Sequence, residues 1–264
     1  MQQLSSAPSC RSCALLNQTN ATTHPRLLLK NRTVAIVGPA AYVERAGIEQ
    51  LVQAADVVIR PNVRFETGHV VLPQHTTSRC DVVYHSGSRL GEMVPGAEGQ
   101  VDKASNYSAL TVHTLRAYQA AGVKSVVLAV EYDALRAANF WRLARNSEFS
   151  GIHFRQLARN DIGAGHRHLR TGLKLLLDVV RQKPRSVHLF GFDLYTSNTH
   201  GFGGYYRDTA SPVQSTWHNT TRELIFMREF ARQHRSVVTL DSHLTRVLNE
   251  AKGQVDDGCT SRGQ

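Results

Sequence analysis

His218 and Glu223 lie five residues apart in the stretch STWHNTTRELIFMREFA, residues 215–231. The stretch has the pattern of a helix, expected from about residue 218 to 234, with His218 at its N-terminal end. The helix dipole is positive at that end and disfavours a charged imidazolium. A neutral imidazole can accept a proton, as a general base must. Taken without its surroundings, the same histidine is more simply interpreted as a helix-start residue.

A second group of residues suited to chemistry opens the helix expected over residues 171–183. Thr171 and Gly172 stand at its start. Their hydroxyl and unpaired N–H groups can cap the helix or hold an anion, because the dipole is positive there. The residues just before it are basic: His166, Arg167, His168 and Arg170. This charge favours a phosphate, and a basic cluster on a solvated helix end is the alternative.

The first expected strand ends in a turn that contains Gly38 and Pro39. The spacing of this turn is not G-x-G-x-x-G, and the P-loop pattern is absent from the chain. The next strand, residues 56–60, leads to Asn62 and carries no acidic residue at its end. An NAD site is therefore poorly supported. A turn that happens to contain glycine is the plain alternative.

Gly191 and a tyrosine pair belong to the segment that leaves the strand expected over residues 186–193. That segment continues to GFGGYYRD, residues 201–208, which includes Tyr205 and Tyr206. Its glycines and tyrosines are typical of an exposed loop over a pocket. The tyrosines could stack on a base or a sugar, or could be ordinary packing residues.

Strands and helices alternate along almost the whole chain. Short apolar runs predict strands at 33–38, 56–60, 80–86, 124–130, 152–157, 186–193 and 236–240. The segments between them predict helices at 42–55, 108–122, 133–145, 171–183 and 218–234, with a last helix from Asp241. The alternation favours one α/β domain, residues 31–264, with a doubly wound, mostly parallel, Rossmann-like sheet after a polar lead-in at 1–30. Ligands of such sheets bind beyond the carboxyl ends of the strands.

The composition is that of a globular protein with an excess of positive charge. The formal net charge is +10 and the isoelectric point is about 9.8, so an anionic partner fits. The basic residues are spread singly rather than in blocks, which argues against nucleic acid. No run of about 18 apolar residues is present, so we expect no membrane span. Cys10 and Cys13 lack a second pair at zinc spacing, and we expect no metal site.

Four stretches, in order, resemble the motifs of the eukaryotic-type sialyltransferases, glycosyltransferase family 29. VAIVGPAAYVERAGIEQLVQAADVVIRPN, residues 34–62, is similar to the large sialyl motif, and Thr76 and Thr77 resemble the threonine pair that follows it. LRTGLKLLLDVVRQKPRSVHLFGFD, residues 169–193, is similar to the small motif. GGYYRD (203–208) and HNTTRE (218–223) resemble the short His-Tyr-Tyr motif and the closing H-x-x-x-x-E motif. The resemblance covers roughly residues 33–230.

The departures from these motifs indicate a divergent member. Pro39 stands where the family has asparagine, and Arg170 stands where it has serine or threonine. Gly204 replaces the histidine before the tyrosine pair. The cysteines that join the large and small motifs in animal members are also absent.

The resemblance implies a variant GT-A-type fold and an inverting transfer from a CMP-sugar, normally CMP-sialic acid, to a glycan hydroxyl. It implies His218 as the base and Glu223 as the organiser of its helix. The residues expected around the donor are Gly38, Pro39, Asn62, Thr171, Gly172, Gly191, Tyr205 and Tyr206. No D-x-D carboxylate pair is present, so we expect no metal and no cofactor beyond the donor itself.

Two other interpretations remain open, and neither the oligomeric state nor the location follows from the sequence. The donor could be CMP-Kdo or another CMP-linked acid sugar. The chain could instead be a non-catalytic protein that binds nucleic acid or an anionic glycan by charge. A complete chain would be expected in the cytoplasm. A fragment of an anchored protein would suit the Golgi lumen, where its N-x-[ST] sequons could be used: Asn17, Asn20, Asn31, Asn106 and Asn219.

Overall fold

The structure is a computed structural model of the chain. It describes residues 29–38, 40, 48–62, 65–66, 69–70, 79–86, 110–129, 134–158, 169–192, 194 and 220–250. Residues 1–28, nearly all of the expected polar lead-in, lie outside the described residues.

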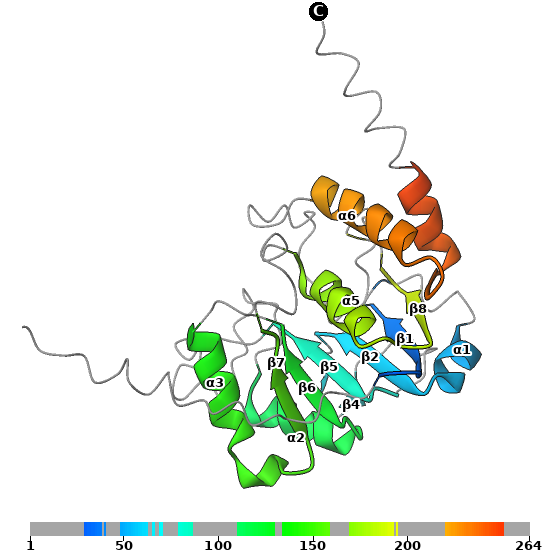
Figure 1. The fold of residues 1–264 in the computed structure, drawn as a ribbon. Coiled ribbons are helices and arrows are strands. Elements are labelled where there is room, and N and C mark those ends of the chain that lie inside the picture. Colours follow the sequence, from blue (N-terminus) through cyan, green and yellow to red (C-terminus); the bar gives the residue numbers. More distant parts are fainter. Residues whose placement is uncertain are drawn as a thin grey trace, which may run out of the picture.

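Within the described residues, seven strands form one sheet in the order β7-β6-β5-β2-β1-β8-β9 (Figure 1). All of its neighbouring pairs are parallel. The strands are β1 (Thr33–Val37), β2 (Val57–Pro61), β5 (Val82–His85), β6 (Ser125–Leu128), β7 (His153–Gln156), β8 (Ser186–Phe190) and β9 (Val238–Leu240). A separate antiparallel pair joins β3 (Phe65–Glu66) to β4 (His69–Val70). The parallel sheet confirms the expected α/β fold.

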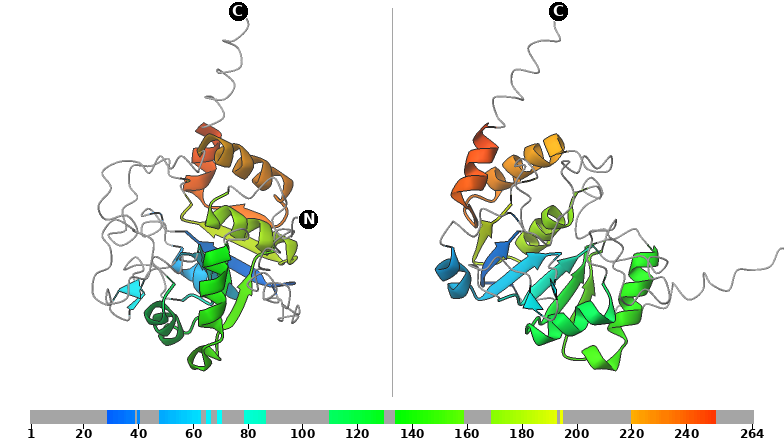
Figure 2. Two further views of the ribbon diagram at one scale, coloured as in Figure 1. Left: turned by 90° about the vertical axis from the view of Figure 1, so that its left-hand side faces the viewer. Right: turned by 180° about the vertical axis from the view of Figure 1, so that it is seen from behind.

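Helices cover both faces of this sheet. They are α1 (Glu49–Ala54), α2 (Val112–Ala120), α3 (Ala134–Ala144), α5 (Thr171–Arg181) and α6 (Thr220–Gln233). A 3₁₀ turn covers Ser147–Phe149, and residues 242–250 are also helical. α5 and α6 lie next to each other on one side of the sheet (Figures 1 and 2). Each expected strand and helix has its counterpart among the described residues. The short β3–β4 pair was not expected.

Alternate residues of β1 explain why its sequence, TVAIV, is apolar without interruption. Val34 and Ile36 belong to the core under α5 and α6. Ala35 and Val37 belong to a second core, which contains Val52 of α1. Because both faces of the strand are covered, no position on it favours a polar side chain. Helices on opposite faces make the sheet doubly wound.

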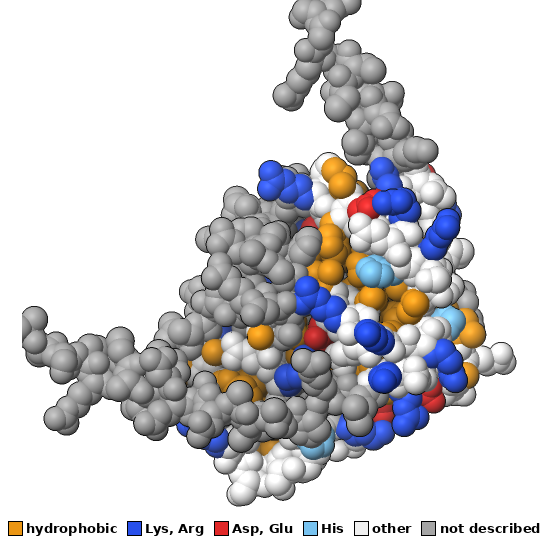
Figure 3. Space-filling model, viewed as in Figure 1, with side chains coloured by type: hydrophobic (Ala, Val, Ile, Leu, Met, Phe, Trp, Pro, Cys, Tyr) orange, Lys and Arg blue, Asp and Glu red, His pale blue; other side chains and the backbone are white. Residues whose placement is uncertain are grey.

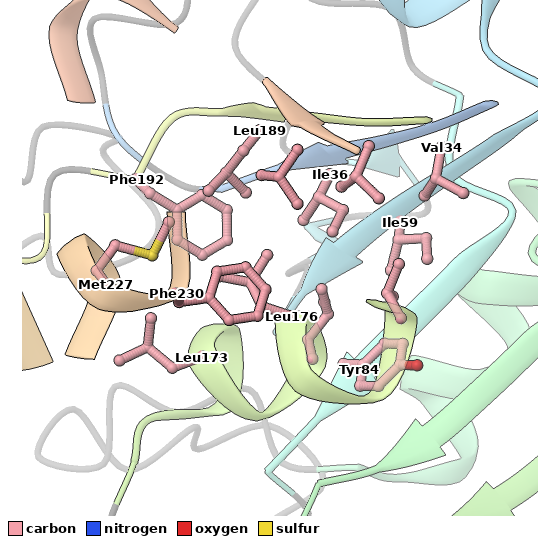
Figure 4. Close-up of a cluster of buried hydrophobic side chains, with 14 of the residues drawn as sticks. Val34, Ile36, Ile59, Tyr84, Leu173, Leu176, Leu189, Phe192, Met227 and Phe230 are labelled. Atoms are coloured by element: carbon pink, nitrogen blue, oxygen red, sulfur yellow. The ribbon is translucent and has the colours of Figure 1, made fainter. Parts of the chain in front are cut away.

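The larger core lies between the sheet and the helices α5 and α6. Leu173 and Leu176 of α5 and Met227 and Phe230 of α6 belong to it, all at most 3% exposed. Figure 4 shows these side chains turned toward the strands of the sheet. Burial of each large apolar side chain contributes about 1.5–3 kcal/mol. This packing holds both helices against one face of the sheet.

A buried polar network also anchors α5. The Asp178 carboxylate on this helix accepts hydrogen bonds from the Tyr84 hydroxyl on β5 and from the Arg155 guanidinium on β7. Gln182 donates a further bond to the same carboxylate at 3.1 Å. Burial of a carboxylate is costly unless it is paired and hydrogen-bonded, and here it is both. The network therefore fixes how α5 sits above the sheet.

Two strands end where the next residue has a positive φ angle. The strand expected over 186–193 ends at Phe190, because Gly191 has φ 72° and turns the chain out of the sheet. β2 is followed by Asn62 at φ 46°, which ends that strand in the same way. Asparagine and glycine are the residues that most readily adopt positive φ. Both strand ends are therefore sharp turns at the carboxyl edge.

Candidate functional site

The sheet has a topological switch point between the carboxyl ends of β1 and β8. These strands are neighbours in the sheet, yet the chain leaves β1 for α1 and leaves β8 for α6. α1 and α6 lie on opposite faces, since they contribute to the cores on opposite sides of β1. Ligands of doubly wound sheets bind at such a switch point. Gly38 and Gly191, two of the expected donor-binding residues, are the first residues beyond these two strands.

The backbones of these two turns touch. The Gly38 N–H donates to the Phe190 carbonyl at 2.7 Å, and the Ala40 N–H donates to the Gly191 carbonyl at 3.1 Å. A Cβ atom on Gly38 would lie 2.3 Å from the Gly191 carbonyl oxygen. Only glycine permits so close an approach. Gly38 is thus required by the packing of the turn.

Substitution of Gly38 by alanine is expected to destabilise the protein, because the clash is with backbone that cannot rotate away. Overpacking of this kind costs about 1–3 kcal/mol. Gly151 is the matched control, since a Cβ there would meet nothing within 4 Å. Gly151→Ala should be neutral or slightly stabilising. Urea denaturation of the two variants measures the difference, and equal stabilities would contradict this account of the turn.

The N-terminus of α5 meets the same place. A Cβ on Gly172 would lie 2.6 Å from the Phe192 ring, and a Cβ on Gly38 would lie 2.8 Å from another atom of that ring. Phe192 is buried and joins the two expected donor-binding segments. Thr171 and Gly172 carry the first N–H groups of α5, which have no acceptor within their own helix. The helix start expected to bind an anion therefore lies at the switch point.

Glu223 ties the start of α6 to the start of α5. Its Oε2 lies 2.5 Å from Arg170 Nη1, and its Oε1 accepts the Arg170 N–H at 3.1 Å. The two side chains are 3% and 13% exposed. Burial raises the pKa of Glu223, and the Arg170 charge offsets only part of that effect. Glu223 therefore joins the start of α6 to the start of α5, and its expected role as organiser of its own helix stays a prediction.

Asn62 joins the ends of β2 and β5. Its N–H donates to the Tyr84 carbonyl at 2.7 Å, and its Oδ1 accepts the Ser86 N–H at 2.8 Å. Because Ile36 pairs with Ile59, Asn62 stands one residue beyond the level of Gly38 on the neighbouring strand. With the carboxamide oxygen engaged, the NH2 group is what this side chain can offer a ligand. Asn62 is therefore at the same edge as the other described candidates.

The remaining expected site residues lie outside the described residues: Pro39, Tyr205, Tyr206 and His218. Their roles stay predictions. Among the described residues, no group of His, Cys, Asp and Glu side chains is arranged to hold a metal ion. In the same part of the chain, no helix is long and apolar enough to cross a bilayer.

Three described residues at this edge were not expected from the sequence. Phe192 joins Gly38 to Gly172, and only tertiary structure reveals that contact. Lys174 is 4% exposed, with its Nζ 3.4 Å from the Ala129 carbonyl just beyond β6. The sequence signal that could have pointed to Lys174 is its place inside the apolar run LKLLL. Asp241 accepts a hydrogen bond from the Gly191 N–H at 3.0 Å, although the sequence indicated it only as a helix start.

The opposite, amino-terminal edge of the sheet is basic. Exposed cations in the segments before the strands are Lys30, Arg32, Lys124, Lys183 and Arg185. Arg185 is 66% exposed and pairs with Asp56. Lys124 is 74% exposed and pairs with Asp81. Figure 3 shows Lys and Arg side chains gathered over the ends of β1, β2 and β8 at the lower right. Part of the excess charge is thus remote from the switch point.

Comparison with known proteins gives structural matches but no family match. No protein-family model and no curated protein matches the chain. A solved structure of a mammalian sialyltransferase is similar at a TM-score of 0.44 and 11% sequence identity, over 80% of this chain and 69% of that one. A likeness at this TM-score is too low to assign family or function.

Proposed function

We propose that this chain is a glycosyltransferase that moves sialic acid, or a similar acid sugar, from a CMP-linked donor to a glycan hydroxyl. One observation supports this most. Gly38, Gly172 and Gly191 come from the two longest stretches that resemble sialyltransferase motifs, and they meet around the Phe192 region at the switch point. A nucleotide is the usual ligand of such a crevice. The resemblance and the topology therefore point to the same place by independent arguments.

The start of α5 suits a monophosphate leaving group. When the bond between the sugar carbon and the phosphate oxygen breaks, the electron pair remains on CMP. Negative charge then grows on the phosphate, and the first N–H groups of α5, at Thr171 and Gly172, can stabilise it. The Arg170 guanidinium lies beside the same helix end, where it pairs with the Glu223 carboxylate. This arrangement requires no metal ion.

The other expected residues complete the reaction in this proposal. His218 takes the proton of the acceptor hydroxyl, which attacks the sugar carbon from the side opposite CMP and inverts it. Asn62 and the turn at Gly38–Pro39 face the nucleotide, while Tyr205 and Tyr206 stack on the base or the sugar. Glu223 organises the helix that carries His218.

A panel of nucleotides tests the class of donor. CMP, CDP, UDP, GDP and NAD are added separately at saturating concentration, and unfolding is followed by thermal shift. A ligand at 100 times its dissociation constant stabilises a protein by about 2.7 kcal/mol. We expect a selective response to CMP. An equal response to GDP or NAD, or none to CMP, would contradict the proposal. Competition between CMP-sialic acid and CMP-Kdo then identifies the sugar.

A second candidate function is charge-driven binding of a polyanion, and the basic amino-terminal edge favours it. The cations there outnumber Asp56 and Asp81, the carboxylates that pair with them. Binding of this kind weakens steeply as salt is added. If it were the function, heparin or duplex DNA would bind with strong salt dependence, and cytidine nucleotides would have no effect. A CMP response that is insensitive to moderate salt separates the two candidates.

A further inference from the structure

Asp241 lies at the carboxyl edge, directly after β9. Its N–H donates to the Leu189 carbonyl of β8 at 3.0 Å. Its carboxylate uses both oxygens: Oδ1 accepts the Leu244 N–H at 2.7 Å, and Oδ2 accepts the Gly191 N–H at 3.0 Å. The first bond caps the helix over residues 242–250. The second reaches the switch point.

The backbone of Gly191 connects Asp241 to the turn after β1. Its N–H is held by Asp241, and its carbonyl accepts the Ala40 N–H at 3.1 Å. Gly191 has φ 72°, a conformation that glycine adopts readily. The carbonyl oxygen of Gly191 is also the atom that a Cβ on Gly38 would meet. A continuous path of contacts therefore runs from Asp241 to the turn at Gly38.

A helix cap alone does not explain the choice of aspartate. Serine, asparagine and aspartate are about equally good at this position of a helix, and one oxygen is enough to cap it. The bond to Gly191 uses the second oxygen, whereas the NH2 group of asparagine cannot accept an N–H group and serine has a single oxygen for both. Hydrogen bonds to an ionised acceptor are also about twice as strong as neutral ones.

We propose that Asp241 is a positioning residue for the donor nucleotide, acting through Gly191 on the turn at Gly38. This inference rests on the proposed function. Asp241 does not itself touch the ligand: it holds the two turns that line the switch point in one arrangement before the nucleotide arrives.

Two substitutions separate positioning from capping. Asp241→Asn and Asp241→Ser each keep one oxygen for Leu244 and lose the bond to Gly191. We expect CMP affinity to fall roughly tenfold and KM for the CMP-sugar to rise more than kcat falls, with a fall in thermal midpoint no larger than that of the control variant. The control is Thr111→Ala, which removes the cap of α2 at Thr114 N. It should lower the thermal midpoint without changing CMP affinity.

The results of these measurements separate the positioning role of Asp241 from the proposed function on which it rests. If the unaltered protein does not bind CMP, the proposed function fails. If it binds CMP and both Asp241 variants bind equally well, the positioning role is wrong and the proposed function stands. A fall in thermal midpoint like that of Thr111→Ala, with CMP affinity unchanged, would mean that Asp241 only caps its helix. Weaker CMP binding by the Asp241 variants, with CMP affinity unchanged in Thr111→Ala, supports positioning.

Discussion

Replacement of His218 by alanine is expected to lower the rate of sugar transfer by about 10²–10⁴-fold, the usual contribution of a general base. The acceptor hydroxyl would then have to lose its proton to water. CMP binding should stay within a few-fold of normal, because the proposed contacts to the nucleotide come from other residues. The measurement is single-turnover transfer from CMP-sialic acid, with CMP affinity determined separately.

The matched control for this variant is His153→Ala. His153 is an exposed histidine at the first position of β7, on the amino-terminal edge of the sheet. Its removal should leave both transfer and CMP affinity unchanged. Normal turnover by His218→Ala would exclude a base at this position. Loss of CMP binding in parallel with turnover would instead assign the histidine to donor recognition.

The element types were predictable because each strand and helix carries its own signal. β1 is apolar at every position after Thr33, since both its faces are covered. β3 and β4 were not predictable, because strands of two residues are too short to show an alternation. The order of the strands in the sheet could not be predicted from the sequence either. A parallel strand joined through a helix can be added on either side of its predecessor, and nothing local places β8 beside β1.

The candidate site was predictable only where a residue follows a strand or opens a helix. Gly38, Asn62 and Gly191 follow strands, and Thr171 opens α5, so topology alone brings them to one edge. The bond between Asp241 and Gly191 joins residues that are 50 positions apart. Nothing in the sequence around either residue indicates that the two are in contact. Contacts of this kind depend on the order of strands, which was itself unpredictable.

Replacement of Glu223 by leucine is expected to lower the free energy of unfolding by about 3–5 kcal/mol, the cost of removing one partner of a buried ion pair. The Arg170 guanidinium, which is 13% exposed, would lose its carboxylate, and the Arg170 N–H would lose its acceptor. Arg170→Met should cost a similar amount for the converse reason. The double variant, Arg170→Met with Glu223→Leu, should recover most of the loss, because no uncompensated charge remains.

Glutamine at position 223 should be tolerated far better than leucine, and the direction of the pKa explains why. Burial raises the pKa of Glu223 above its ordinary value of 4.5, so ionisation of this side chain opposes folding. The stability it contributes is fully present below pH 4.5 and is lost as the pH rises through the folded-state pKa. Glu223→Gln keeps an oxygen for the Arg170 N–H and removes this pH-dependent loss. Urea denaturation between pH 4 and pH 8 should therefore show the unaltered protein losing stability relative to Glu223→Gln as the pH rises. A relative gain would mean that attraction to Arg170 outweighs burial.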